Sequence, residues 1–178
     1  MDQNKYFNTA SIVSSNRVLY TPSSFARTSL LHLQEIGTLH ALAPHTSKRD
    51  GLQSYLFFTV LSGAGELSYD GKEYSLKPGN CVFIDCRKAY SHTTPSQNKG
   101  DEGDNLWSLR WCHFYGPTLS FVYEKYCERG GKAVFSPSSA APFLTTLDKL
   151  YELASGSDYI RDMRINEELN KLCTLLMA

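Results

Sequence analysis

Histidine and cysteine are the residues of this chain most able to bind metals or act as nucleophiles, but their spacing predicts neither kind of centre. The histidines are His32, His40, His45, His92 and His113. Two histidines two residues apart on a strand point to the same face, and no such pair occurs. The five cysteines include no CxxC pair, and no GxSxG turn presents a serine nucleophile. We therefore expect no metal ion, no cofactor and no catalytic residue.

Both tryptophans lie on one expected strand and indicate a different kind of site. Residues two apart on a strand share a face, so Trp107, Leu109 and Trp111 point the same way. If that face is the inside of a barrel, the indole rings offer flat apolar surfaces to a small molecule such as a sugar. Arg49 and His92 would then supply polar contacts. The same pattern also fits tryptophans in a packed core and an arginine at the surface, and the residues alone leave both readings open.

The surrounding segment has the short apolar runs and intervening turns that are typical of antiparallel β structure. Apolar runs are separated by turn residues at 62–65, 70–71 and 78–79. Asp70-Gly71 favours a type I′ hairpin, because glycine accepts a positive φ without a Cβ clash. Gly37 divides two further runs, so we expect two separate strands there. About eight short strands predict a sandwich or a jelly-roll barrel. The expected strands are 30–35, 38–43, 55–61, 66–69, 72–76, 81–84, 90–94 and 106–114.

After Phe114 the apolar period changes to that of helices. We expect three, opened by Pro117, by Ser136-Pro137 and by Asp158. The fold class is therefore mainly β, a barrel followed by C-terminal helices. Residues 1–116 are expected to form the barrel with an N-terminal arm, and residues 117–178 a helical dimerisation segment.

The last expected helix carries a stripe of four apolar residues, Ile165, Leu169, Leu172 and Leu176. Their steps of four, three and four match coiled-coil spacing, so we predict that the stripe pairs with its copy in a homodimer. The alternative is that it packs against its own barrel. The sequence stops inside this apolar pattern, which suggests a fragment of a longer protein.

Composition limits the class of protein. The 178 residues include 18 basic and 18 acidic side chains, with 42% hydrophobic and 20% charged residues. These proportions fit one globular domain and lack the basic excess of a nucleic-acid binder. No apolar run is long enough to span a membrane, and the first fifteen residues do not form a signal peptide. An odd number of cysteines fits a reducing compartment, so we expect a cytoplasmic protein with no membrane partner.

Four segments, taken in order, resemble one known family. They are 56–67 (LFFTVLSGAGEL), 69–80 (YDGKEYSLKPGN), 82–92 (VFIDC, then YSH) and 107–114 (WSLRWCHF). Each is weak alone, but their order and spacing resemble the N-terminal effector-binding and dimerisation domain of AraC-family transcriptional regulators. The resemblance runs from about Leu30 to the last helix.

This resemblance implies a cupin-like barrel that binds a small effector, often a sugar, and helices that pair two protomers. It also implies a C-terminal DNA-binding domain with two helix-turn-helix motifs, which the 178 residues do not include. The positions that match effector contacts in sugar-sensing members are Arg49, His92 and Trp111. Leu109 stands where the best-known member has a polar pocket residue, and Tyr90 where many members have a histidine.

We therefore expect the sensing half of a transcription factor and not an enzyme. It would bind a sugar or related metabolite, form a homodimer, control carbohydrate-use genes and reach DNA only through the missing domain. One alternative is a metal-dependent cupin enzyme, an isomerase or dioxygenase. Another is a non-catalytic assembly module with a filled barrel, in which Arg49 and His92 would point outward, since burying them without partners is costly.

Overall fold

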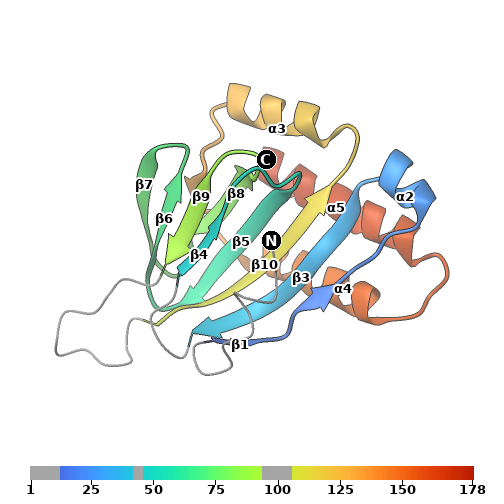
Figure 1. Ribbon diagram of the computed structural model, residues 1–178, viewed down its shortest axis with the longest axis horizontal. Helices are drawn as coiled ribbons and strands as arrows, with labels where there is room; N and C mark the ends of the chain where they lie inside the picture. The colour runs from blue at the N-terminus through green and yellow to red at the C-terminus, as the bar shows by residue number, and fades with distance from the viewer. Residues whose placement is uncertain (1–12, 42–45, 94–105) are drawn as a thin grey trace.

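The computed structural model describes residues 13–41, 46–93 and 106–178 of the chain (Figure 1). Its largest element is an antiparallel sheet with the strand order β1-β3-β10-β5-β8-β11, to which β2 is added on β3. The strands of this large sheet are β1 (Val13–Ser15), β2 (Val18–Leu19), β3 (His32–Ala41), β5 (Tyr55–Ser62), β8 (Cys81–Asp85), β10 (Ser108–Tyr115) and β11 (Val134–Phe135).

A second, smaller antiparallel sheet has the order β4-β9-β6-β7. Its strands are β4 (Thr46–Arg49), β6 (Gly65–Tyr69), β7 (Lys72–Leu76) and β9 (Tyr90–Thr93). The two sheets share a hydrophobic core, to which both contribute side chains. This is the predicted jelly-roll arrangement.

Helices cover the other face of the large sheet. Figure 1 shows α4 and α5 behind β3, β10 and β5, with α3 at one end of the strands. In the described ranges the helices are α2 (Ser24–Ser29), α3 (Leu119–Glu128), α4 (Ala141–Ser155) and α5 (Arg161–Met177). The short helix α2 was not expected from the sequence, whereas the three later helices were.

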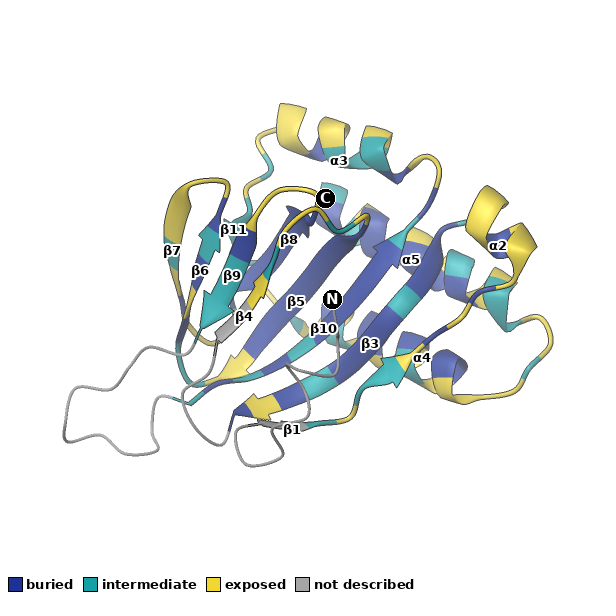
Figure 2. Cartoon of the chain, viewed as in Figure 1, coloured by how far each residue is buried: buried dark blue, intermediate teal, exposed yellow. Residues whose placement is uncertain are grey.

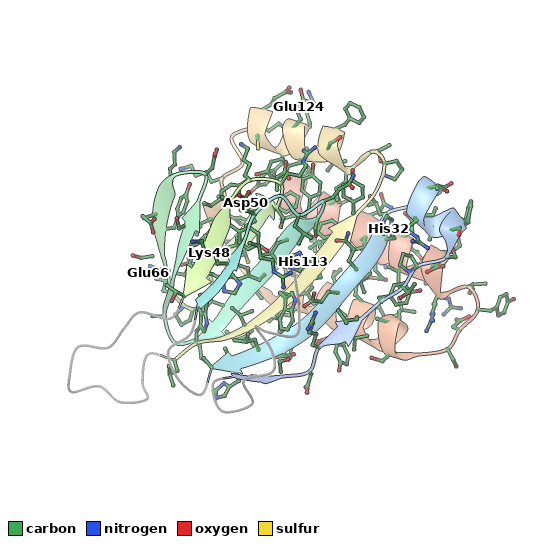
Figure 3. All side chains as sticks on the ribbon, viewed as in Figure 1. His32, Lys48, Asp50, Glu66, His113 and Glu124 are labelled. Carbon is green, nitrogen blue, oxygen red and sulfur yellow. The ribbon has the colours of Figure 1, made fainter. Side chains whose placement is uncertain are left out.

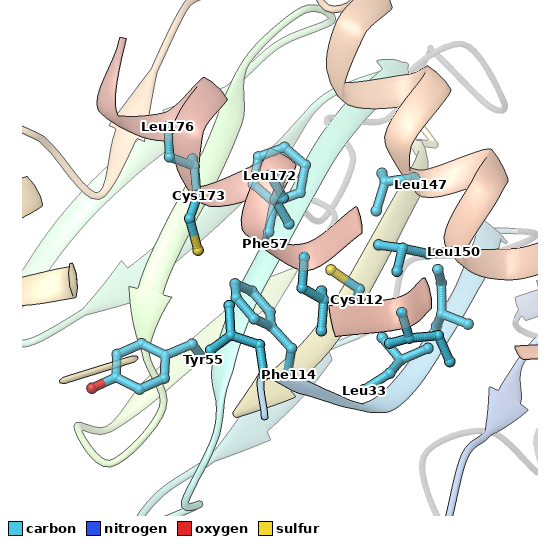
Figure 4. Close-up of a cluster of buried hydrophobic side chains, with 14 of the residues drawn as sticks. Leu33, Tyr55, Phe57, Cys112, Phe114, Leu147, Leu150, Leu172, Cys173 and Leu176 are labelled. Atoms are coloured by element: carbon cyan, nitrogen blue, oxygen red, sulfur yellow. The ribbon is translucent and has the colours of Figure 1, made fainter. Parts of the chain in front are cut away.

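The large sheet is buried on both faces, as the dark strands in Figure 2 show. Alternate residues of each strand point to opposite faces, so the sheet serves two cores. On the outer face Phe57, Cys112 and Phe114 meet Leu147 and Leu172 of the helices (Figure 4). We call this the outer core. The inner core lies between the two sheets.

The predicted dimer stripe belongs to the outer core, and here the structure corrects the prediction. Ile165, Leu169, Leu172 and Leu176 are at most 8% exposed within a single chain. The large sheet offers a continuous apolar face directly beneath α5, so these side chains are already covered. The alternative reading, packing on their own barrel, is the one observed, and the stripe is not free to pair with a second copy.

The helical segment is also joined to the barrel through the backbone. Strand β11, which lies between α3 and α4, pairs with β8 at Val134↔Val82 and Phe135↔Cys81. Residues 117–178 therefore contribute both a strand and a helical layer to the large sheet.

Of two predictions that rest on glycines, one is confirmed and the other is wrong. Asp70 and Gly71 have φ values of 49° and 77° and close the two-residue turn between β6 and β7, so the predicted hairpin is confirmed. Gly37 does not end a strand, because β3 runs through it. A Cβ there would lie 2.7 Å from Cη2 of Trp111, so this glycine makes room for an indole ring rather than for a turn.

Candidate functional site

A cavity lies inside the barrel between the two sheets. Its volume is about 20 Å³. Five of the six predicted effector contacts line it, namely Arg49, Tyr90, His92, Leu109 and Trp111. The other lining residues are Glu35, Leu39, Leu56, Phe58 and His113. Residues from five strands of both sheets therefore meet at the place that the sequence analysis proposed.

Strand β10 supplies three of the lining side chains by simple alternation. Leu109, Trp111 and His113 point into the barrel, and Figure 3 shows His113 near the middle of the molecule. Arg110, between them, points to the helices and forms an ion pair with Asp148 of α4. The period of two that placed the tryptophans on one face also places His113 there, so this residue could have been found from the sequence.

Arg49 comes from a strand that the sequence analysis did not predict. It ends β4, where it lies opposite Tyr90 of β9. Its neighbours Lys48 and Asp50 are exposed and are labelled in Figure 3, whereas Arg49 itself is half-buried and lines the cavity. The filled-barrel alternative predicted that Arg49 and His92 point outward, and both instead line the interior.

Glu35 is a site residue that the sequence analysis missed. Its Oε1 accepts a hydrogen bond from Nε1 of Trp111 at 3.2 Å and pairs with Nε of Arg17 at 2.9 Å. The side chains of Arg17 and Glu35 are only 10% and 6% exposed. A buried carboxylate thus fixes both the indole of Trp111 and the guanidinium of Arg17.

A β-bulge in β3 separates Glu35, which faces the barrel, from Leu33. In the pairing with β10, Glu35 lies opposite His113 and Leu33 opposite Phe114, so Gln34 is an extra residue. Leu33, two residues before Glu35, consequently packs in the outer core. Counted back from Leu39, a period of two puts Glu35 on the inner face, but the sequence analysis expected two strands divided at Gly37, so the pattern did not single out Glu35.

Three aromatic rings surround His92. The ring centroids of Phe58 and Trp107 each lie 5.6 Å from that of His92, and Tyr90 stacks beside it at 6.5 Å. Trp107, the sixth predicted contact, does not line the cavity. It is fully buried behind His92, against Gly65, where a Cβ would lie 2.1 Å from its ring. For Trp107 the core reading therefore holds.

Three titratable groups in or near the cavity, His113, Cys86 and Tyr90, are neutral at neutral pH. Nδ1 of His113 shares a hydrogen bond with Oγ of Ser54 at 2.9 Å, and burial, together with the nearby charge of Arg49, lowers the pKa of His113 to about 3. Burial also raises the pKa of the Cys86 thiol to about 12 and raises the pKa of Tyr90. A protonated thiol is a poor nucleophile, so these groups are suited to hydrogen bonding rather than to covalent chemistry.

Within residues 13–41, 46–93 and 106–178, no three His, Cys, Asp or Glu side chains are grouped closely enough to hold a metal ion. In the same ranges no helix has both the length and the apolar character needed to cross a membrane.

The chemistry available in the cavity is recognition. Arg49 offers a planar fork of donors, Trp111 offers a flat apolar surface, and Tyr90 and His92 add polar atoms. Leu39, Leu56, Phe58 and Leu109 complete an otherwise apolar wall. This set of side chains is suited to contacting a small molecule that has both a polar and an apolar side.

Two facing antiparallel sheets, with helices on one outer face, define a mainly β fold of the cupin type. No protein-family model and no curated protein matches the chain. Solved structures do match, in 259 chains. A cupin superfamily protein from Desulfitobacterium hafniense covers 57% of this chain and 78% of its own, at 9% identity and a TM-score of 0.40. A salicylate 1,2-dioxygenase from Pseudaminobacter salicylatoxidans covers 59% of this chain and 27% of its own, at 15% identity and a TM-score of 0.40.

The AraC-like transcriptional activator CuxR matches over barrel and helices together. It covers 99% of this chain at a TM-score of 0.57 and 13% identity. The chain spans 65% of the activator's length. What the two share at this identity is the fold, a cupin-like barrel followed by C-terminal helices. The predicted fold, a mainly β cupin-like barrel followed by C-terminal helices, is thereby confirmed.

Proposed function

We propose that this chain is the ligand-sensing domain of an AraC-type transcriptional regulator and that it binds a sugar or related small metabolite inside the barrel. The observation that carries the proposal is the convergence of Arg49, Tyr90, His92, Leu109 and Trp111 on one interior cavity. A purely structural barrel has no need of an inward-facing arginine. The fold shared with an AraC-like activator over 99% of the chain supports the regulatory part.

In this proposal the ligand lies against Trp111, and Arg49 and His92 bond to its polar atoms. Directed hydrogen bonds of this kind distinguish closely related sugars, which differ little in apolar area. The role is binding and not catalysis, in keeping with the protonated Cys86 and the neutral His113.

Binding has to be accompanied by a conformational change. A cavity of about 20 Å³ holds little more than one water molecule, whereas small-molecule sites usually measure about 300 Å³ or more. The ligand must therefore favour a more open arrangement of the two sheets. A ligand that prefers one of two conformations shifts their populations, which is what a sensor requires.

The regulatory part of the proposal assigns DNA binding to a helix-turn-helix domain outside these 178 residues. It places the protein in the cytoplasm, as a homodimer that controls carbohydrate-use genes. Dimer contacts must then use side chains other than the buried stripe on α5.

A thermal-unfolding screen against monosaccharides, disaccharides and sugar phosphates tests the binding function. Ligand at about a hundred times its dissociation constant adds about 2.7 kcal/mol to the unfolding free energy. For a chain of this size that raises the unfolding temperature by about 5 to 10 °C. The rise should disappear in Trp111→Ala and persist in Arg110→Gln, a matched change on the same strand that faces the helices. A rise that survives Trp111→Ala would place the ligand elsewhere.

A further inference from the structure

We infer that the ligand of the barrel carries a carboxylate group, which the guanidinium of Arg49 binds. The inference rests on the proposed function, because it names the chemical class of the molecule held in that same cavity. It follows from the balance of charges around the cavity and from the surroundings of Arg49.

The charged side chains at the described cavity do not balance. Glu35 and Arg49 line it, and Arg17 reaches Glu35 from beyond the lining. The single carboxylate of Glu35 is paired with Arg17 at 2.9 Å. No ion pair found among the described residues involves Arg49. Two guanidinium groups and one carboxylate leave one positive charge, which belongs to Arg49.

The charge of Arg49 is directed into the barrel. Its positive charge adds to the effect of burial in lowering the pKa of His113. For Cys86 and Tyr90 the charge opposes burial, which is the larger influence and raises both pKa values. These residues lie on β10, just after β8 and on β9, so the guanidinium acts on groups from both sheets. Its sequence neighbours Lys48 and Asp50 face solvent instead.

None of these neighbouring groups can neutralise Arg49. Cys86 and Tyr90 keep their protons at neutral pH, because burial raises both pKa values, and His113 carries no charge to offer. Leu56, Phe58 and Leu109 add apolar side chains to the wall. A charge in such surroundings is stabilised when a partner of opposite sign enters with it.

A carboxylate matches the guanidinium of Arg49 in charge and in shape. Its two oxygens match the planar fork of an arginine in a two-point contact. Its single negative charge balances the single excess positive charge, whereas a phosphate dianion would leave a net negative charge in the barrel. The apolar wall and Trp111 then receive the body of the molecule.

Paired compounds that differ only in the acid group test the inference. Calorimetric titrations compare D-glucose with D-glucuronate, D-galactose with D-galacturonate, and benzyl alcohol with benzoate. We expect at least one acid to bind 10-fold or more tightly than its neutral partner. Arg49→Gln should weaken the binding of that acid at least 100-fold. Lys48→Gln removes the adjacent exposed charge from the same strand and should change the affinity less than 2-fold.

A second measurement does not depend on the body of the ligand. In ¹⁵N NMR spectra, the Nε–H signal of Arg49, assigned by its loss in Arg49→Gln, should shift saturably with sodium acetate or benzoate and not with sodium chloride. If that signal stays fixed, the inference is wrong. If a neutral sugar binds as tightly as its acid, the inference is also wrong, but the proposed binding function stands. If neither class binds, both are overturned.

Discussion

Glu35 and Trp111 face each other across β3 and β10, with Nε1 of the indole donating to Oε1 of the carboxylate at 3.2 Å. The same oxygen is 2.9 Å from Nε of Arg17. One buried carboxylate therefore positions the aromatic surface of the proposed site and holds the chain segment that leads to β2. Removing it should affect both stability and binding.

Glu35→Ala should destabilise the fold by about 3 to 5 kcal/mol, because it removes the acidic member of a buried ion pair. Urea unfolding measures this free energy. Arg17→Met combined with Glu35→Leu removes both charges and should recover most of the loss. If the unfolding free energy of Glu35→Ala lies within about 1 kcal/mol of that of the parent, the ion pair is not formed in solution.

Acidification should destabilise the protein through His113. Its pKa is about 3 when folded, against 6.5 for a free histidine. Between these values the unfolded chain binds a proton that the folded chain does not, so stability is complete above pH 6.5 and falls as the pH is lowered. The slope contributed by this residue is at most about 1.4 kcal/mol per pH unit.

Urea unfolding of the parent and of His113→Gln between pH 7 and pH 5 isolates this effect, since most carboxylates titrate at lower pH. The variant should lose the part of the slope that His113 contributes, whereas His32, whose pKa burial also lowers, keeps its own part. His40→Gln changes an exposed histidine and should retain the contribution of His113. Equal slopes in the parent and in His113→Gln would contradict a buried neutral imidazole.

Gly65→Ala should destabilise the barrel by about 1 to 3 kcal/mol or more, because the new Cβ would lie 2.1 Å from Cζ3 of Trp107. The indole cannot move away easily, since it is fully buried. Thermal unfolding provides the measurement. Gly156→Ala, where the nearest atom is 3.4 Å away, is the control and should change stability far less.

Leu169→Ala should lower the unfolding free energy by about 2 to 5 kcal/mol without changing the molecular mass of the folded species. The reason is that Leu169 is fully buried against the large sheet of its own chain. Light scattering gives the mass and urea unfolding gives the stability. The exposed neighbour in Glu167→Ala should leave both unchanged. A clean conversion of a dimer into stable monomers by Leu169→Ala would restore the original dimer prediction.

Short sequence motifs predicted the parts of the fold that are set by residues adjacent in the chain. The Asp70-Gly71 hairpin formed because both residues accept the positive φ that the turn needs. Gly37 is also a glycine, but it makes room for the ring of Trp111, which lies on a neighbouring strand and is remote in the sequence. Composition and period cannot distinguish these two uses of glycine.

The candidate site divides in the same way. Alternation along β10 placed Leu109 and Trp111 correctly and extends to His113. Glu35 follows from the same alternation only when β3 is continued through Gly37, and Arg17 reaches the site through an ion pair, which no period predicts. The helical stripe on α5 had the right spacing for either of two partners, and only the position of the sheet decided between them.

Tryptophan fluorescence tests most directly whether a small molecule binds in the barrel beside Trp111. The chain has two tryptophans, so Trp107→Phe leaves Trp111 as the single reporter. Titration of this variant with the sugars and sugar acids named above, alongside calorimetry, compares binding with the environment of that one ring. We expect the emission of Trp111 to change saturably, at the same concentrations at which heat is released. A compound that binds by calorimetry and leaves Trp111 emission unchanged would contradict the account.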